Sequence, residues 1–212
     1  MLDLNTILLA ILAYLLGSIP FAVYVSKGYH GIDVRDYGSG NAGATNVFRV
    51  LGKKWGSIVL LLDIFKGFTA ANLAYFVETE FASNNLVLLK IVFGMLAVLG
   101  HLYPIFAEFK GGKGIAALLG MVIAIHYLLA LGCIGVFVLV LLVTGIVSIS
   151  SIISTMMFGL FAYALFGFSE PVIIFFGIFV MVLVLFTHRS NIKRIWNGEE
   201  KRIQFKKPMK SE

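Results

Sequence analysis

A run of small and polar residues from Asp36 to Arg49 (DYGSGNAGATNVFR) lies between two long apolar stretches of the sequence. Glycine lets the backbone turn back on itself and leaves N–H groups open to a ligand, and hydroxyl, amide and guanidinium side chains add further donors. Many donors and few carboxylates suit an oxyanion such as phosphate. The candidate binding residues of this first segment are Gly38, Ser39, Gly40, Asn41, Gly43, Thr45, Asn46 and Arg49.

The spacing Gly38-x-Gly40-x-x-Gly43 also matches the glycine fingerprint of dinucleotide-binding proteins. That fingerprint requires a preceding strand within a βαβ unit, and the sequence predicts neither. We therefore exclude a dinucleotide site. Ala44 to Leu51 is instead expected to form a short interfacial helix that ends at Gly52 and places Thr45 and Arg49 on one face.

A second donor-rich segment, Phe109 to Gly114 (FKGGKG), repeats the combination of glycines and cations. It is not a Walker A loop, because no glycine lies five residues before Gly112 and neither Ser nor Thr follows Lys113. A third basic segment, His188 to Arg194 (HRSNIKR), follows the last apolar run. In the second segment we expect a phosphate to be bound by Lys110, Gly111, Gly112, Lys113 and Gly114.

The composition places these segments in a membrane protein. Hydrophobic residues make up 59% of the 212 residues and charged residues 13%, whereas a soluble domain has roughly 25% charged residues. The chain is therefore expected to be an all-α polytopic membrane protein. The N-terminal apolar run lacks a basic region before it and is expected to be a retained span rather than a signal peptide. Cys133 is the single cysteine, so the chain cannot form an internal disulfide.

Apolar runs long enough to cross a bilayer, which takes about 20 residues, predict the transmembrane helices. Pro20 is expected to kink the first of them, and the 33-residue run around His126 is too long for one span. Ser148 to Ser151 is expected to be a polar break before the last two spans. The runs are Leu4–Val25, Trp55–Val77, Leu86–Phe106, Ile115–Val147, Ile152–Phe168 and Val172–Thr187.

The net charge of +6 is concentrated in three clusters, which lie around Arg35–Lys54, Lys110–Lys113 and His188–Lys210. Lys and Arg in short loops stay on the cytoplasmic side, so an even number of spans must separate the clusters. This requirement predicts about seven spans, with the N-terminus and the loop Glu78–Asn85 outside and the C-terminus in the cytoplasm. The cations could also be explained without a binding site, by membrane topology and contact with anionic lipid. The glycines beside Arg49, Lys110 and Lys113 nevertheless favour a binding function.

Two charged residues lie within the predicted second span. Asp63 and Lys66 are three residues apart on one helix, so they can pair with each other. Alternatively, they face the site and position its cations, since intramembrane charges are costly and often functional. His101 and His126 are expected to be structural.

The three segments together resemble the signature segments of the bacterial acyl-phosphate:glycerol-3-phosphate acyltransferases of the PlsY type. The resemblance rests on GSGNAGATNVFR, GHLYPIFAEFKGGKG and THRSNIKRIWNGEE, with GSIPF at Gly17–Phe21 and the serines at 148–151 in agreement. It implies a single integral-membrane acyltransferase domain over residues 1–212 with seven spans in the cytoplasmic membrane. It also implies transfer of an acyl chain from acyl phosphate to the 1-hydroxyl of glycerol 3-phosphate, which gives lysophosphatidic acid and inorganic phosphate.

The resemblance also assigns roles to individual residues. It implies that Ser39 and Arg49 are catalytic, together with His188 and Asn191, and that a structural glutamate lies at Glu199 or Glu200. A serine pair that binds substrate falls on Ser150 and Ser151, although Ser148 offers another register. The expected partners are glycerol 3-phosphate, acyl phosphate and membrane lipid, with no cofactor, metal, nucleic acid or obligate protein partner.

Two mechanisms agree with these assignments. Ser39 could be an acylated nucleophile with His188 as its base. Alternatively, Ser39 donates a hydrogen bond to phosphate, and the phosphate of the substrate takes the proton; we favour this route because Ser39 does not lie in a G-x-S-x-G elbow. Acyltransferases that use thioesters have a His that is followed five residues later by Asp. None of the four histidines of this chain is followed by Asp at that spacing, so acyl phosphate is the expected donor.

A transporter or channel for a phosphorylated solute is the alternative function. Interrupted helices and intramembrane charges are common in transporters. Against this function, the donor-rich segments are all predicted at one membrane surface, and the sequence has no visible inverted repeat.

Overall fold

The computed structural model describes residues 3–167, 169 and 171–203, and in these residues every regular element is a helix. The all-α prediction is therefore confirmed. The chain divides into two compact units, one that extends to Ile125 and one that begins at His126. We describe each unit by itself.

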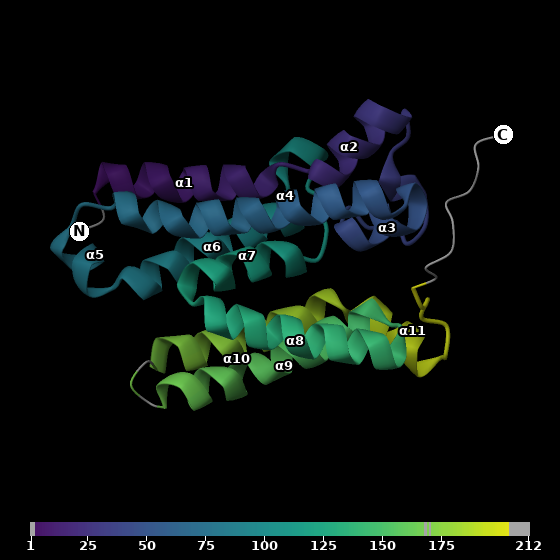
Figure 1. The fold of residues 1–212 in the computed structure, drawn as a ribbon. Coiled ribbons are helices and arrows are strands. Elements are labelled where there is room, and N and C mark those ends of the chain that lie inside the picture. The colour runs from purple at the N-terminus through teal and green to yellow at the C-terminus, as the bar shows by residue number, and fades with distance from the viewer. Residues whose placement is uncertain (1–2, 168, 170, 204–212) are drawn as a thin grey trace. The chain divides into compact units, whose positions relative to one another are not determined.

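In unit 1, α1, α4, α6 and α7 run side by side, with α5 at one end and α2 and α3 at the other (Figure 1). Short 3-10 helices connect them. The elements are α1 (Leu4–Ser18), α2 (Phe21–His30), η1 (Val34–Asp36), α3 (Ala44–Leu51), α4 (Lys53–Asn72), η2 (Leu73–Phe76), α5 (Glu80–Asn84), α6 (Leu86–Leu102), η3 (Ile105–Ala107) and α7 (Ile115–Ile125).

The first apolar run is broken where the sequence predicts a kink. Helix α1 ends at Ser18, α2 begins after Pro20, and the two helices meet at an angle of 42°. Pro20 has no N–H to continue the ladder of helical hydrogen bonds. The break leaves the carbonyl of Ile19 available to a side chain of another helix.

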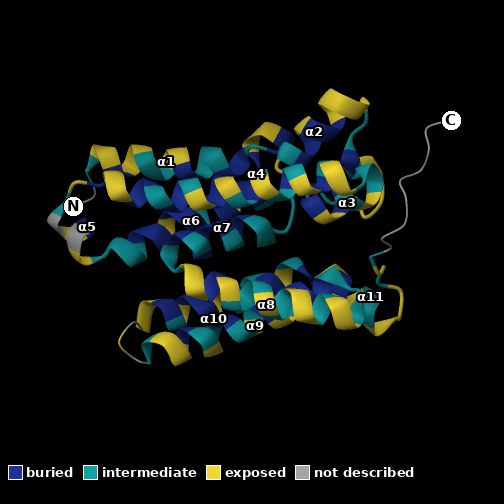
Figure 2. Ribbon diagram, viewed as in Figure 1, coloured by how far each residue is buried: buried dark blue, intermediate teal, exposed yellow. Residues whose placement is uncertain are grey.

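Glycines bring the helices of unit 1 into close contact. A Cβ on Gly17 would overlap the backbone of Ala97, and one on Gly100 would overlap the carbonyl of Tyr14, so α1 and α6 contact each other through glycines on both helices. Gly67 and Gly120 form the same arrangement between α4 and α7. Small residues let helix backbones approach closely in a membrane, where the hydrophobic effect does not drive helices together. The inward faces are buried and the outward faces exposed (Figure 2).

Unit 2 contains α8 (Tyr127–Thr144), α9 (Val147–Phe166), α10 (Pro171–Thr187) and the short basic helix α11 (Arg189–Trp196). The 33-residue apolar run is interrupted at His126, which has an extended backbone between α7 and α8. Helix α9 packs against both α8 and α10, and α11 leaves α10 at an angle of 63°.

The predicted polar break at Ser148–Ser151 is wrong, because these serines lie in the first turns of α9. The break occurs just before them, where Gly145 ends α8 with a φ of 70°. Ser150 and Ser151 donate their hydroxyls to the carbonyls of Ile146 and Val147, four residues earlier. Serines with such local acceptors are tolerated within a helix.

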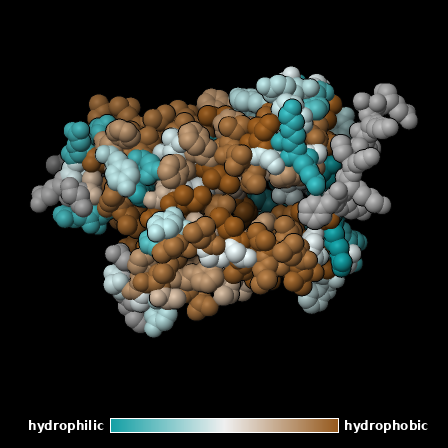
Figure 3. All heavy atoms as spheres, viewed as in Figure 1, coloured by the Kyte–Doolittle hydropathy of each residue, from teal (hydrophilic) through white to brown (hydrophobic). Residues whose placement is uncertain are grey.

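The helices are those of a multi-pass membrane protein. Within the described residues four helices are long and apolar enough to span a bilayer, and up to six spans result if each bent pair, α1–α2 and α10–α11, counts as one. Helix α7 is apolar but has only 11 residues. Exposed hydrophobic side chains cover the visible helix flanks, and hydrophilic ones gather near the helix ends (Figure 3). Seven spans and their orientation stay predictions.

Candidate active site

The first donor-rich segment forms a loop that is shaped by Asn46. The Asn46 side chain accepts a hydrogen bond from the N–H of Ser39 at 2.8 Å and donates to the carbonyls of Val34 and Tyr37 at 2.9 and 3.0 Å. Gly38 and Gly40 have φ values of 68° and 71°, a region that other residues rarely adopt. A Cβ on Gly38 would overlap the amide oxygen of Asn46. The structure thus shows Asn46 buried among loop backbone groups, and substrate binding by its side chain stays a prediction.

The predicted helix Ala44–Leu51 is present as α3 and ends at Gly52. Thr45 and Arg49 lie one turn apart on it, and both are exposed, as is Ser39 in the loop before it. This part of the site therefore has two hydroxyls and a guanidinium at exposed positions.

A cluster of charges links this loop to the second one. Asp33 pairs with Arg35 at 2.7 Å and with Lys27 at 3.1 Å. The hydrogen bonds from Arg35 hold the pKa of the Asp33 carboxyl well below its ordinary value. The remaining guanidinium nitrogen of Arg35, Nη1, donates to the carbonyl of Ala107 at 3.1 Å. The two loops therefore lie at the same end of unit 1, as the charge pattern predicts.

The second loop is compact and hydrogen-bonded to itself. Phe109 donates its N–H to the carbonyl of Pro104 at 2.9 Å, and Lys110 donates to that of Ala107 at 3.0 Å. Glu108 and Phe109 both have positive φ values, 56° and 57°, which are costly for residues with a Cβ and often mark functional loops. Lys110 is exposed, and Lys113 is half-buried.

Gly112 is in contact with the buried histidine at the end of α6. Its N–H donates to the carbonyl of His101 at 3.1 Å, so this N–H is already occupied by the protein in the structure. A Cβ on Gly112 would overlap Nε2 of His101 and come within 3.2 Å of the Ala42 carbonyl. Gly112 therefore packs against both the first loop and His101.

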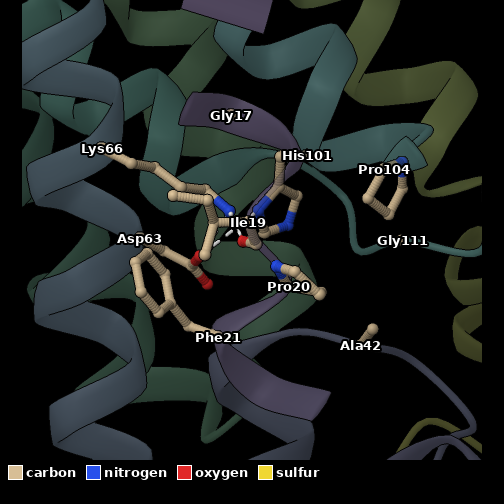
Figure 4. Close-up of a pocket in the computed structure, with 10 residues that line it drawn as sticks. All are labelled: Gly17, Ile19, Pro20, Phe21, Ala42, Asp63, Lys66, His101, Pro104 and Gly111. Atoms are coloured by element: carbon tan, nitrogen blue, oxygen red, sulfur yellow. Dashed lines mark hydrogen bonds and ion pairs between the residues drawn. The ribbon is translucent and has the colours of Figure 1, made fainter. Parts of the chain in front are cut away.

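A small cavity beneath the loops is lined by Asp63, Lys66 and His101 (Figure 4). Lys66 pairs with Asp63 at 2.8 Å, as the spacing predicts, and also donates to the carbonyl of Ile19 at 2.9 Å in the α1–α2 break. Nδ1 of His101 lies 3.5 Å from the same oxygen of Asp63. The pairing of Asp63 with Lys66 is thus confirmed, and a role of this pair in positioning the cations of the site stays a prediction.

In unit 2 the carboxylate of Glu200 accepts three hydrogen bonds. The donors are the side chains of Asn191 at 2.6 Å, Ser148 at 2.7 Å and Arg194 at 2.8 Å. Burial alone would raise the pKa of Glu200, but these three donors lower it below its ordinary value. Of the two candidate glutamates, Glu200 is therefore the one that positions Asn191.

His188 is buried at the junction of α10 and α11. Its Nδ1 lies 2.9 Å from the carbonyl of Val184, an acceptor, so in the neutral ring Nδ1 carries the hydrogen and Nε2 carries the lone pair. Asn191 is one turn further along the chain on α11 and is also buried. Ser150 and Ser151 are buried in α9 with the local hydrogen bonds described above.

A family model described as glycerol-3-phosphate acyltransferase matches residues 7–198 of the chain. This protein belongs to the glycerol-3-phosphate acyltransferase family. It is 45% identical over 93% of its length to glycerol-3-phosphate acyltransferase 2 of Bacillus anthracis, of which it covers 98%. It is 42% identical over 93% of its length to the enzyme named glycerol-3-phosphate acyltransferase from Chlorobium phaeobacteroides, of which it covers 97%.

Two solved structures of PlsY, an integral membrane glycerol 3-phosphate acyltransferase, share the fold. One is its glycerol 3-phosphate form, with a TM-score of 0.83 and 40% identity, and the other is its lysophosphatidic acid form, with a TM-score of 0.81 and 39% identity. In each case the alignment covers 94% of this chain and 96% of the other. The resemblance of the three signature segments to this family is thereby confirmed.

Sequence reasoning missed several residues that shape the site. It treats Arg35 only as the start of a charge cluster, does not consider Asp33, and gives Ser148 only as an alternative register. Opposite charges two residues apart before a glycine-rich segment are the signal that could have found the first pair. Among the described residues no group of three His, Cys, Asp or Glu side chains could hold a metal ion.

Proposed function

We propose that this protein transfers an acyl chain from acyl phosphate to the 1-hydroxyl of glycerol 3-phosphate and forms lysophosphatidic acid and inorganic phosphate. The observation that carries the proposal is the link between its two glycine-rich loops, through Arg35 and Ala107, at one end of a membrane-embedded helix bundle. Relatives over nearly the whole chain are named for acylation of glycerol 3-phosphate.

The chemistry demands placement more than activation. The 1-hydroxyl oxygen attacks the acyl carbon, the bond from that carbon to the phosphate oxygen breaks, and the hydroxyl proton leaves with the released phosphate. Phosphate is already a good leaving group. Orienting the two substrates can contribute up to about 7–11 kcal/mol to lowering the barrier.

Both substrates are anions, so their approach requires cations and hydrogen-bond donors. In this proposal Arg49, with Ser39 and Thr45 beside it, binds the phosphate group of acyl phosphate, and Lys110 and Lys113 bind that of glycerol 3-phosphate. The exposed positions of Ser39, Thr45, Arg49 and Lys110 support this assignment. Gly38, Gly40, Gly43, Gly111 and Gly114 give the loops their shape and let the backbone approach the oxygens, and the side-chain amide of Asn41 is a further donor.

In unit 2, the side chains of His188 and Asn191 are the proposed ligands of the glycerol hydroxyls. Glu200 holds the Asn191 amide in one orientation, and the carbonyl of Val184 leaves a lone pair on Nε2 of His188. These two groups suit hydrogen bonds to glycerol hydroxyls, with Ser150 and Ser151 on the neighbouring helix α9. The acyl chain would lie along the apolar helix surfaces.

We infer that the acyl group passes directly between the substrates and not through Ser39. In support, Ser39 lies in a loop of turns and its N–H is bound to Asn46, unlike a nucleophile at a strand-to-helix elbow. An acyl-Ser39 ester, detected by mass spectrometry after incubation with donor alone and released by hydroxylamine, would contradict this inference.

The protein is proposed to act as a single domain in the cytoplasmic membrane, with seven spans, its N-terminus outside and its active site facing the cytoplasm. The four long helices, the two bent pairs and the apolar helix α7 together supply seven apolar segments. The basic clusters support the orientation. No protein partner is required for the reaction as proposed.

The deciding experiment supplies purified protein with radiolabelled glycerol 3-phosphate and either acyl phosphate or acyl-CoA. We expect lysophosphatidic acid and an equal amount of inorganic phosphate from acyl phosphate, and no product from acyl-CoA. Arg49→Ala protein is the control for uncatalysed transfer. Comparable product from acyl-CoA would refute the donor, and no product from either would refute the activity. Uptake of glycerol 3-phosphate into vesicles without acylation would instead favour a transporter.

A further inference from the structure

Three buried ionisable side chains in unit 1 take no part in the reaction as proposed. Asp63, Lys66 and His101 are only 1%, 4% and 6% exposed. Lys66 Nζ and His101 Nδ1 both face Oδ1 of Asp63, at 2.8 and 3.5 Å. A buried carboxylate is stable only with such partners, so the three side chains constrain one another.

Each member of this cluster also contacts a different segment of the backbone. Lys66 donates to Ile19 in the break between α1 and α2. The carbonyl of His101 accepts the N–H of Gly112, and the Nε2 edge of its ring lies against the Gly112 Cα. On its other side the same glycine lies near the carbonyl of Ala42, in the first loop. The cluster therefore connects the helix bundle to both loops.

The His101 ring has two edges with different contacts. Its Nδ1 edge faces Asp63, and its Nε2 edge faces Gly112 (Figure 4 shows Asp63 and His101 around the cavity). A carboxylate at one ring nitrogen fixes both the orientation of an imidazole and the position of its hydrogens. Since Gly112 has room for no side chain there, the tilt of the ring determines where the glycine can lie.

We propose that Asp63 and His101 are positioning residues for the loop Lys110–Gly114: Asp63 orients the imidazole, and the imidazole sets the place of Gly112. The inference rests on the proposed function, in which this loop binds the phosphate of glycerol 3-phosphate. Neither side chain touches substrate. Loss of either one would misplace the loop in the ground state and in the transition state alike.

Steady-state kinetics on purified Asp63→Asn, His101→Asn and His101→Gln proteins test this role. Asn retains a donor near the position of Nδ1 but removes the ring edge against Gly112, whereas Gln reaches the Nε2 position and loses the Nδ1 donor. We expect each variant to raise the KM for glycerol 3-phosphate about 10-fold or more, with kcat and the KM for acyl phosphate within about 2-fold, the pattern of weakened uniform binding.

A double substitution separates this contact from a general loss of structure. Gly112→Ala alone forces a methyl group onto the His101 ring, so it should raise the KM for glycerol 3-phosphate strongly. In His101→Asn protein the ring is gone, so adding Gly112→Ala should cost much less than it does in the wild type. Two substitutions that remove the same contact have non-additive effects on the free energy of binding. Two independent substitutions would instead multiply their fold-changes in KM.

Lys90→Met is the matched control, because Lys90 is also a buried cation of unit 1 but bonds to Tyr75 and to the Ala124 carbonyl, away from the loops. It should lower the melting temperature and leave the KM for glycerol 3-phosphate unchanged. Should His101→Asn fail to fold, the KM values of Asp63→Asn and His101→Gln still test the positioning role. An inactive wild type would refute the proposed function. An active wild type with unchanged KM in these variants, or with multiplicative effects of His101→Asn and Gly112→Ala, would overturn the positioning role.

Discussion

Arg35 donates a hydrogen bond from its guanidinium to the carbonyl oxygen of Ala107 at 3.1 Å, across 72 positions of the sequence. The same side chain pairs with Asp33, which lies just before the first glycine-rich loop. One residue thus joins the segments that we expect to bind the two anionic substrates.

Arg35→Lys should separate these roles, because an ammonium can pair with Asp33 but cannot at the same time reach Ala107 as a planar fork does. Removal of one hydrogen bond costs about 1 kcal/mol, so we expect kcat/KM for glycerol 3-phosphate to fall about 5-fold. Lys27→Met is the control, since Lys27 pairs with Asp33 and is mostly exposed. Equal decreases in both variants would show that the ion pair matters and the Ala107 hydrogen bond does not.

Arg49→Lys tests whether geometry or charge matters at the exposed end of α3. In the transition state a charge-assisted bidentate interaction is worth about 1.5–3 kcal/mol, and Lys cannot form it, so kcat/KM should fall about 10- to 100-fold. Arg189→Lys, on exposed α11, should have little effect. Wild-type rates from Arg49→Lys would mean that positive charge alone is sufficient.

Glu200→Gln should weaken the hold on Asn191 and lower kcat, because a neutral amide accepts weaker hydrogen bonds and puts an NH2 group in place of one acceptor oxygen. The ionised carboxylate binds its three donors better than its protonated form does, and the pKa of Glu200 is lowered by them. Its stabilisation is therefore complete above the ordinary pKa of 4.5 and is lost as the pH falls through the lowered value. The melting temperature of the wild type should decrease on acidification from about pH 6 to below pH 4 more than that of Glu200→Gln. Equal decreases in the melting temperatures of the two proteins would show that the Glu200 carboxylate does not cause the loss of stability in acid.

Gly67→Ala should destabilise the protein, because a Cβ at this position overlaps the Ala117 carbonyl at the α4–α7 interface. Overpacking of this kind costs about 1–3 kcal/mol, which thermal unfolding in detergent would detect as a lower melting temperature. Gly135→Ala is the matched control, since a Cβ on this helical glycine meets no atom within 4 Å. Equal melting temperatures for the two variants would refute close packing at Gly67.

The proposed orientation predicts which positions react with a membrane-impermeant thiol reagent in intact cells. With Cys133 replaced by Ser, a cysteine at Glu78 should be labelled and one at Lys110 should not, because the basic loop is expected in the cytoplasm. Both residues are exposed, so both should be labelled once the membrane is permeabilised. Labelling of Lys110→Cys but not Glu78→Cys in intact cells would reverse the topology.

The sequence by itself determined the fold class and the approximate positions of the long apolar helices. Hydropathy is a local property, as are the effects of Pro20 on α1 and of glycine on the loops, so these features can be read along the chain. The prediction failed at the serines after Gly145. Their hydroxyls donate to backbone carbonyls four residues earlier, so these polar residues do not interrupt the helix.

Only the tertiary structure decided which side chains contact the candidate site residues. Glu200 rather than Glu199 holds Asn191, Ser148 donates to the same carboxylate from 52 residues away, and His101 connects Asp63 to Gly112. Such partners are chosen by helix packing, which brings distant residues within about 3 Å and buries polar groups that must then be satisfied. The composition of one segment contains no information about the partner that packing will place beside it.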